Sequence, residues 1–250
     1  MEKILGILIF YLFLFFTASS LKASEVLVYR NESMPWCGTV DGKDAGIMID
    51  ILNAVTKNGG PKFKFESVPW TRAQRLVQEN KGTAIIPLTR VATREENHTW
   101  IIELVPNRAR LTTARNPMRK VTIPSPLTLV NSKPLIIGII RGSALNTSMK
   151  ELGFTKLHEV NTAEQLAQML SMGRVDAVVE SKWVDNYVWS QAGLEGDDLI
   201  VGPNVGETKY IYLGAALNFP QEITNQIRKA MFEVKKSGAL EKILTRWTNF

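Results

Sequence analysis

The sequence predicts an α/β protein, because short β-rich runs alternate with amphipathic helical stretches along the chain. Two Thr-x-x-Gln sequences, which begin at Thr71 and Thr162, have the form of capping boxes that open helices. Near the C-terminus, Gly238 separates two apolar stripes at helical spacing, which is typical of a helix pair packed on a core. These observations together favour a layered fold of strands and helices.

The strands are expected where apolar and β-branched residues cluster between polar stretches. Their ranges are 26–29, 63–67, 84–88, 135–140 and 175–179. The helix that begins at Thr162 ends at Gly173 and buries one face. The residues on that face are Ala163, Leu166, Ala167 and Leu170, and the C-terminal stripes contain Ile223, Ile227, Ala230, Met231 and Val234, then Leu240, Ile243, Leu244 and Trp247.

A proline-bearing stretch, residues 116–134, interrupts the alternation and predicts a change of domain. The chain has 250 residues, which allows one large domain or two small ones with buried cores. Charged residues make up 22% of the chain, an ordinary fraction that argues against disorder. We therefore expect a folded protein with one or two α/β units.

The composition excludes several kinds of site. A single cysteine, Cys37, rules out an intramolecular disulfide, and with only His98 and His158 beside it there is little material for a metal site. We expect neither a metal nor a cofactor, and Cys37 is interpreted as a small half-buried residue beside Trp36. The net charge of +6 suits anionic ligands, but no Lys/Arg-rich run indicates nucleic-acid binding.

The N-terminus has the form of a secretory signal. Residues 4–16 are almost wholly apolar, follow Lys3, and precede a stretch of small and polar residues. Thirteen residues are too few to cross roughly 30 Å of hydrocarbon comfortably, but they suit the apolar centre of a signal peptide. We expect residues 1–23 to be removed, after Ser20 or Ala23, and the protein to be periplasmic; an uncleaved membrane anchor is the alternative.

Four segments, in order, resemble the periplasmic solute-binding proteins of family 3 that serve ABC importers of polar amino acids. Gly46-Ile-Met-Ile-Asp50 resembles the signature that opens the family's first helix, with Ile47 where an aromatic residue is usual. Thr93-Arg94-Glu95 resembles the segment that carries the clamp for the ligand carboxylate. Met172-Gly-Arg-Val-Asp-Ala-Val-Val179 and Lys236-Ser-Gly-Ala-Leu-Glu-Lys-Ile-Leu-Thr-Arg-Trp247 resemble the start of a second-lobe strand in the family and its closing motif.

This resemblance implies a periplasmic-binding-protein-like fold of type II, in which two α/β lobes close about a hinge. Lobe 1 would comprise residues 24–108 and 217–250, and lobe 2 residues 116–209. Two hinge strands, residues 109–115 and 210–216, would cross between them. The C-terminal helices would then pack on lobe 1.

The resemblance also implies a ligand-binding site between the lobes. Arg94 would clamp a carboxylate, since a guanidinium binds one bidentately, although a surface arginine paired with Glu95 or Glu96 is the alternative. Thr89 would supply a hydroxyl to the same carboxylate, and Arg90 would either enter the cleft or point away. No catalytic residue is expected.

Aromatic residues and one turn complete the implied site. Trp70 would stack on the ligand or else belong to the core, and Arg72 would reach the cleft rim or be solvated. Trp36 lies in the first strand-to-helix loop, where the family places aromatic residues over the ligand. Gly142 and Ser143 resemble the turn of the second lobe whose backbone N–H and hydroxyl groups meet the ligand carboxylate.

One departure from the family pattern concerns the ligand's α-ammonium group. Ser181 stands at the position where the family usually has an aspartate for that group, and the neighbouring Glu180 would face the other way if the strand continues. The sequence therefore leaves open an anionic organic ligand without an α-ammonium group. The arginines that favour it are Arg30, Arg72, Arg90 and Arg94.

We expect a monomeric, non-enzymatic protein that captures a small carboxylate-bearing solute for the permease of an ABC importer. Two alternatives remain. Periplasmic cyclohexadienyl dehydratases resemble this family, and a dehydratase would need Glu180 or Glu32 as a general acid. A sensory partner that presents its bound ligand to a membrane receptor is the other.

Overall fold

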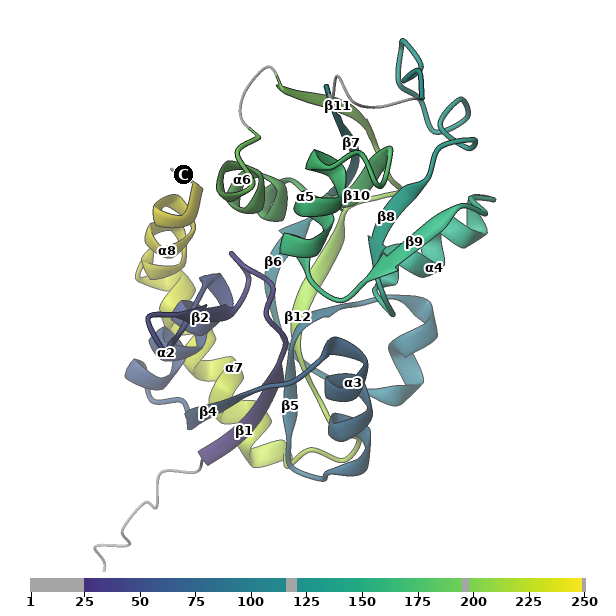
Figure 1. Cartoon of the computed structure of the whole chain (residues 1–250). Coiled ribbons are helices and arrows are strands. Elements are labelled where there is room, and N and C mark those ends of the chain that lie inside the picture. Colours follow the sequence, from purple (N-terminus) through teal and green to yellow (C-terminus); the bar gives the residue numbers. More distant parts are fainter. Residues whose placement is uncertain (1–24, 116–120, 195–197, 249–250) are drawn as a thin grey trace, which may run out of the picture.

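The structure is a computed structural model that describes residues 25–115, 121–194 and 198–248. The segment interpreted as a signal peptide, residues 1–23, lies outside the described residues. Figure 1 shows two lobes, each built from a five-stranded sheet with helices on its faces. The α/β class and the two-lobe architecture are confirmed.

The sheet of lobe 1 has the strand order β4-β1-β5-β12-β6. Strand β1 pairs in parallel with β4 and β5, whereas β12 is antiparallel to both of its neighbours. The elements of lobe 1 are β1 (Glu25–Arg30), β2 (Gly38–Val40), β3 (Lys43–Ala45), α2 (Ile47–Lys57), β4 (Lys62–Ser67), α3 (Trp70–Glu79), β5 (Ala84–Thr89), the 3-10 helix η1 (Ala92–Asn97), β6 (Thr99–Asn107), β12 (Lys209–Ala215), α7 (Gln221–Lys236) and α8 (Ala239–Thr248).

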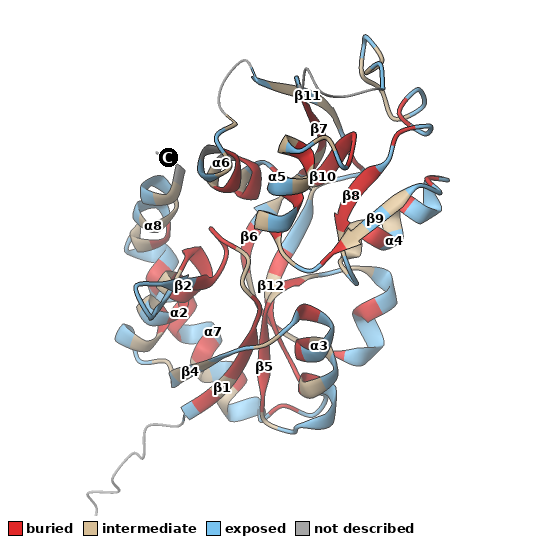
Figure 2. Cartoon of the chain, viewed as in Figure 1, coloured by how far each residue is buried: buried red, intermediate tan, exposed pale blue. Residues whose placement is uncertain are grey.

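Both faces of this sheet are covered, so alternate side chains along a strand enter two different cores. Val28 of β1 is buried with residues of α2 and α7, whereas the adjacent Tyr29 is buried with residues of α3. In β5, Ile86 lies on the α2 side and Ile85 on the α3 side. Figure 2 accordingly shows the central strands as buried, with helices on either side of them.

The sheet of lobe 2 has the strand order β11-β7-β10-β8-β9. Strand β10 is parallel to β8 and antiparallel to β7. Here too the core is divided, because Val179 packs with Met149 of one helix while Val178 packs with Leu166 of another. The elements of lobe 2 are β7 (Ala109–Ala114), β8 (Ile137–Ile140), α4 (Ala144–Glu151), β9 (Leu157–Val160), α5 (Ala163–Ser171), β10 (Ala177–Ser181), α6 (Lys182–Gln191) and β11 (Leu199–Asn204).

The chain crosses between the sheets twice, in short segments. Strand β6 of lobe 1 leads through Arg108 into β7 of lobe 2, and β11 of lobe 2 leads through residues 205–208 into β12 of lobe 1. The crossings are therefore shorter than the expected ranges 109–115 and 210–216, because ladder pairing already begins at Ala109 in one sheet and at Lys209 in the other.

The C-terminal helices pack on lobe 1. Helices α7 and α8 contact α2, and α7 also contacts β6. Gly238 separates them in the left-handed conformation, with φ of 71°. The side chain of Asp50 on α2 anchors α8, since it accepts a hydrogen bond of 2.7 Å from Trp247 Nε1 and forms an ion pair with Arg246.

Only one of the two predicted capping boxes caps its helix. The Thr162 side chain accepts a hydrogen bond from the backbone N–H of Gln165 at 3.3 Å, so it caps α5 as predicted. Thr71 does not cap α3, because the helix already begins at Trp70 after Pro69. Among the described residues, no helix is long and apolar enough to cross a membrane.

Candidate functional site

A cavity of about 110 Å³ lies between the two lobes. It forms where the carboxyl ends of parallel strands face each other, the usual position of ligand sites in open α/β sheets. From lobe 1, β1 leads to Asn31 and β5 ends at Thr89; from lobe 2, β8 leads to Ser143. Six of the ten predicted site residues line the cavity, namely Trp36, Trp70, Thr89, Arg94, Ser143 and Glu180.

Arg94 lies in η1 and is only 9% exposed. Its guanidinium donates hydrogen bonds to the carbonyl oxygen of Thr89 at 3.0 Å and to Gln74 Oε1 at 3.0 Å. Among the residues that the structure describes, it forms no ion pair, so the alternative of a surface pair with Glu95 or Glu96 is wrong. Burial without a counter-charge lowers the pKa of Arg94 to about 10.

The carbonyl oxygen of Gly142 joins lobe 2 to this arginine. It accepts hydrogen bonds from Arg94 Nη2 at 3.2 Å, Trp70 Nε1 at 3.2 Å and Gln74 Nε2 at 3.4 Å. Gly142 is thus beside the cavity without lining it, and the lobes are in contact at this point. Its neighbour Ser143 lines the cavity and caps α4, because Ser143 Oγ accepts a hydrogen bond from the N–H of Asn146.

The two residues at the end of β10 face opposite ways. Glu180 lines the cavity, and burial raises the pKa of its carboxyl group to about 7. Ser181 is fully buried outside the cavity, where its hydroxyl accepts a hydrogen bond from the N–H of Val184 and opens α6. Of these two neighbours, Glu180 therefore brings an acidic group to the cavity, whereas Ser181 does not reach it.

The four arginines that favoured a purely anionic ligand do not gather in the cavity. Arg90 forms an ion pair with Glu95 at 2.8 Å and lies over the rings of Trp100 and Tyr212, at 5.3 and 5.5 Å from their centroids. Arg72 is exposed on α3. Of the four, only Arg94 lines the cavity.

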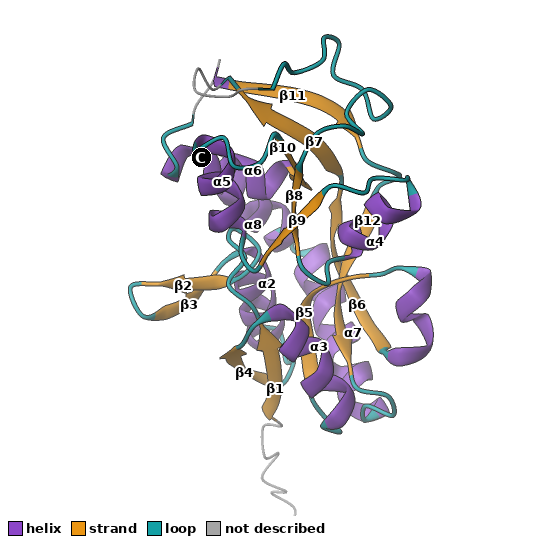
Figure 3. Ribbon diagram, turned by 45° about the vertical axis from the view of Figure 1, so that its right-hand side comes forward, coloured by secondary structure: helices purple, strands orange, loops and turns teal. Residues whose placement is uncertain are grey.

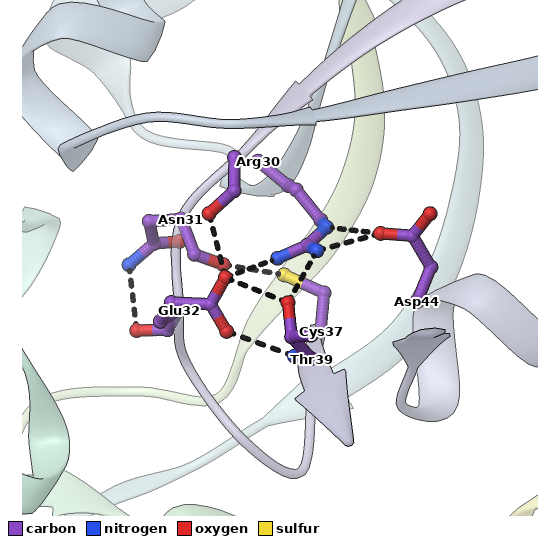
Figure 4. A network of polar contacts seen from close by, with 7 residues as sticks. Arg30, Asn31, Glu32, Cys37, Thr39 and Asp44 are labelled. Atoms are coloured by element: carbon purple, nitrogen blue, oxygen red, sulfur yellow. Dashed lines mark hydrogen bonds and ion pairs between the residues drawn. The ribbon is translucent and has the colours of Figure 1, made fainter. Parts of the chain in front are cut away.

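Arg30 is buried in a network of its own, shown in Figure 4. Its guanidinium lies between two carboxylates, with Glu32 at 2.7 Å and Asp44 at 2.6 Å, and it donates a further hydrogen bond to Thr39 Oγ1. Thr39 and Asp44 belong to the β2–β3 hairpin, which projects from lobe 1 in Figure 3. Arg30 therefore fastens this hairpin to the end of β1.

The sequence alone missed several polar residues of the cavity. Asn31 is 8% exposed, and within the described part of the chain neither its Oδ1 atom nor that of Asn107 has a hydrogen-bond partner. Glu207 comes from the second crossing, and Lys209 is the first residue of β12. Each lies at the end of a strand or within three residues of one, which is the only local signal that marks them. The described residues include no cluster of histidine, cysteine and acidic side chains suited to a metal ion.

Known proteins resemble the chain over most of its length. The profile of the bacterial extracellular solute-binding proteins, family 3, matches residues 26–250. The L-cystine-binding protein TcyA of Bacillus subtilis (strain 168) is 22% identical over 237 residues, which are 92% of this chain and 83% of that protein.

Two solved structures show the same fold. The arginine-, lysine-, histidine-binding protein ArtJ from Geobacillus stearothermophilus is similar with a TM-score of 0.75 at 18% identity, over 90% of this chain and 95% of that one. A histidine kinase sensor domain with similarity to periplasmic binding proteins has a TM-score of 0.80 at 13% identity, over 91% and 97% of the two chains.

Proposed function

Since the chain belongs to the bacterial extracellular solute-binding proteins of family 3, we propose that it captures a small α-amino acid between its lobes and delivers it to an ABC importer. The proposed setting is the periplasm, reached with a cleaved signal peptide, and the proposed working form is a monomer.

The observation that carries the proposal is the uncompensated charge of Arg94. A buried cation without an anion is costly, and here the guanidinium donates its hydrogen bonds to the neutral oxygens of Thr89, Gln74 and Gly142. A ligand carboxylate supplies the missing negative charge, and charge-assisted hydrogen bonds of this kind are worth about 1.5–3 kcal/mol each. The Thr89 and Ser143 side chains, in the same cavity lining, are suitable further partners.

Glu180 supports an amino group on the same ligand. Its carboxyl group lines the cavity from lobe 2, opposite the lobe that carries Arg94. A zwitterionic ligand suits this arrangement, because its carboxylate can pair with Arg94 of lobe 1 and its ammonium group with Glu180 of lobe 2. Such a ligand joins the two lobes. The indoles of Trp36 and Trp70 supply apolar walls between these charges. The names of TcyA, an L-cystine-binding protein, and ArtJ, which binds arginine, lysine and histidine, agree with this class of ligand.

Isothermal titration calorimetry with the twenty common L-amino acids and L-cystine tests the proposal. At least one should bind saturably to the secreted protein, and Arg94→Ala should weaken that binding at least tenfold. Arg90→Ala is the matched control, because Arg90 is exposed and already paired with Glu95. Binding that is equally sensitive to both substitutions, or insensitive to Arg94→Ala, would contradict the proposed clamp.

One observation favours a second function, a dehydratase on the same scaffold. A carboxyl group with a pKa of about 7 in a cavity between the lobes, as at Glu180, is suited to general acid catalysis. Glu32 is not, since hydrogen bonds from Ser67 and Arg30 outweigh its burial and lower its pKa. Incubation with prephenate and arogenate decides the matter: turnover that Glu180→Gln abolishes would support an enzyme.

A further inference from the structure

The indole rings of Trp36 in lobe 1 and Trp183 in lobe 2 lie in contact, with centroids 5.8 Å apart and planes inclined at 47°. We infer that Trp183, which does not line the cavity, is a positioning residue that holds the cavity wall formed by Trp36 and so couples lobe closure to ligand capture. The inference rests on the proposed solute-binding function and names two residues through which closure acts on that site.

Trp36 is held firmly from its own lobe. It is 3% exposed, its N–H donates to the carbonyl oxygen of Ser33 at 2.9 Å, and its own carbonyl oxygen accepts from the N–H of Met48 on α2 at 2.9 Å. The Arg30 network fastens the hairpin that follows this loop. The backbone of Trp36 is therefore fixed to lobe 1, while its ring contacts the ring of Trp183 in lobe 2.

Trp183 is attached just as closely to the acidic side of the site. It lies in the first turn of α6, three residues after Glu180, and the Ser181 hydroxyl that caps this turn binds the N–H of Val184. Val184 is 1% exposed in the core of lobe 2. Glu180 and Trp183 thus move with lobe 2 as one unit, so a ligand that engages Glu180 also brings Trp183 onto Trp36.

The apolar contact is continuous with both cores. Trp36 belongs to a buried cluster that includes α2 residues such as Ile51 and also α6 residues such as Val188, and Trp183 packs against that cluster. A separate contact between the lobes, at the carbonyl of Gly142, is polar and includes the proposed clamp residue Arg94. The ring contact can therefore be altered without changing a residue that lines the cavity.

The test compares Trp183→Ala with Trp183→Phe, which keeps a ring. The control is Trp100→Ala, a half-buried tryptophan whose ring contacts Tyr212 within lobe 1 at 5.4 Å. Small-angle X-ray scattering gives the radius of gyration of each secreted protein without ligand, and stopped-flow measurements give the dissociation rate of L-cystine, used as the probe. Thermal unfolding of each variant shows that it is folded.

We expect Trp183→Ala to have a larger radius of gyration than the unsubstituted protein and to release the probe about two- to tenfold faster, the range that an aromatic pair of ordinary strength implies. Trp183→Phe should restore most of both values, and Trp100→Ala should change neither. If Trp183→Ala matches the Trp100→Ala control in scattering and in release, the inference is overturned. If L-cystine does not bind, the scattering comparison alone decides about Trp183, whereas the calorimetric panel decides about the proposed function.

Discussion

Arg94 of lobe 1 donates a hydrogen bond of 3.2 Å from Nη2 to the carbonyl oxygen of Gly142 in lobe 2. This bond closes the cavity beside the buried guanidinium and gives it a neutral acceptor where a carboxylate would bind more strongly. The carbonyl group of Gly142 therefore joins lobe 2 directly to the proposed clamp residue.

Gly142→Ala should weaken ligand binding. Gly142 has φ of 66°, and a Cβ atom there would lie 3.0 Å from Thr71 Cγ2 of lobe 1. The left-handed backbone costs an L-residue about 1–2 kcal/mol in any state, but the contact with Thr71 exists only when the lobes are closed. Calorimetry should show an affinity at least several-fold lower than that of the unsubstituted protein.

The matched control for this prediction is Gly193→Ala. Gly193 has φ of 70°, and among the described residues none beyond its own chain neighbours lies within 4 Å of the place that a Cβ would take, so it shares the backbone strain without a contact between lobes. Both variants should lose similar stability in urea, and only Gly142→Ala should lose affinity. An equal loss of affinity in both variants would mean that backbone strain causes it, and would contradict a role for the contact with Thr71.

Ligand affinity should fall as the pH falls below 7. The carboxyl group of Glu180 has a pKa of about 7, raised by burial, so at pH 8 it is mostly ionised and at pH 5.5 mostly protonated. Because only the ionised form pairs with an ammonium group, affinity should decrease by up to about tenfold for each pH unit below 7. Titration calorimetry between pH 5.5 and 8.5 measures this slope, and Glu180→Gln should remove it. A slope that persists in Glu180→Gln would assign it to another group.

Arg110→Ala should be strongly destabilising. Arg110 Nε donates to Asp185 Oδ2 at 2.9 Å, and the Asp185 side chain is fully buried. Removing the arginine leaves an uncompensated buried carboxylate, which costs about 3–5 kcal/mol. Urea unfolding at pH 8 measures the loss. Because burial already raises the pKa of Asp185 to about 6, the loss should be smaller at pH 5, where the group takes up a proton.

Arg75→Ala serves as the comparison for Arg110→Ala. Arg75 and Glu79 form an exposed pair one helical turn apart, at 3.6 Å. Its removal should lower the free energy of unfolding by less than about 0.5 kcal/mol. Equal losses in the two variants would contradict the importance of the buried pair.

Cys37 should resist alkylation in the folded protein. The residue is fully buried rather than half-buried as expected from the sequence, and its thiol donates a hydrogen bond to the carbonyl oxygen of Asn31 at 3.4 Å. Burial raises the pKa of the thiol to about 12, so the reactive thiolate is scarce at pH 8. Mass spectrometry after iodoacetamide treatment should find no label on the folded protein. It should find full labelling after unfolding in about 8 M urea. Labelling of the folded protein at the rate of a free thiol would contradict this burial.

Local sequence patterns predicted the central strands of lobe 1, whose side chains are mostly apolar and buried. The ranges 26–29 and 84–88 correspond closely to β1 and β5. Strand β6 was not predicted, and no local pattern specifies its pairing with β12, which lies in a distant part of the chain. The start of α3 was misplaced by the Thr71 motif, since Pro69 and the buried Trp70 set the helix start before it.

The residues that line the cavity were predictable only where they lie in segments that resemble the family. Arg94 and Arg90 lie four residues apart, and nothing local distinguishes the buried one from the one that lies over Trp100. Their difference arises from η1, which turns Arg94 toward Gly142. Asn107 and Lys209 reach the cavity because β6 and β12 are adjacent, which is again a property of the folded sheet.

The position of β12 between β5 and β6 also sets an order for folding. Lobe 2 is formed by one continuous stretch, from β7 to β11, and has all its strands before β12 has been made. Lobe 1 begins first along the chain but cannot complete its sheet until its last strand and the helices α7 and α8 follow. A nascent chain released before Lys209 would therefore carry a finished second lobe attached to an open first sheet, with the facing edges of β5 and β6 unpaired.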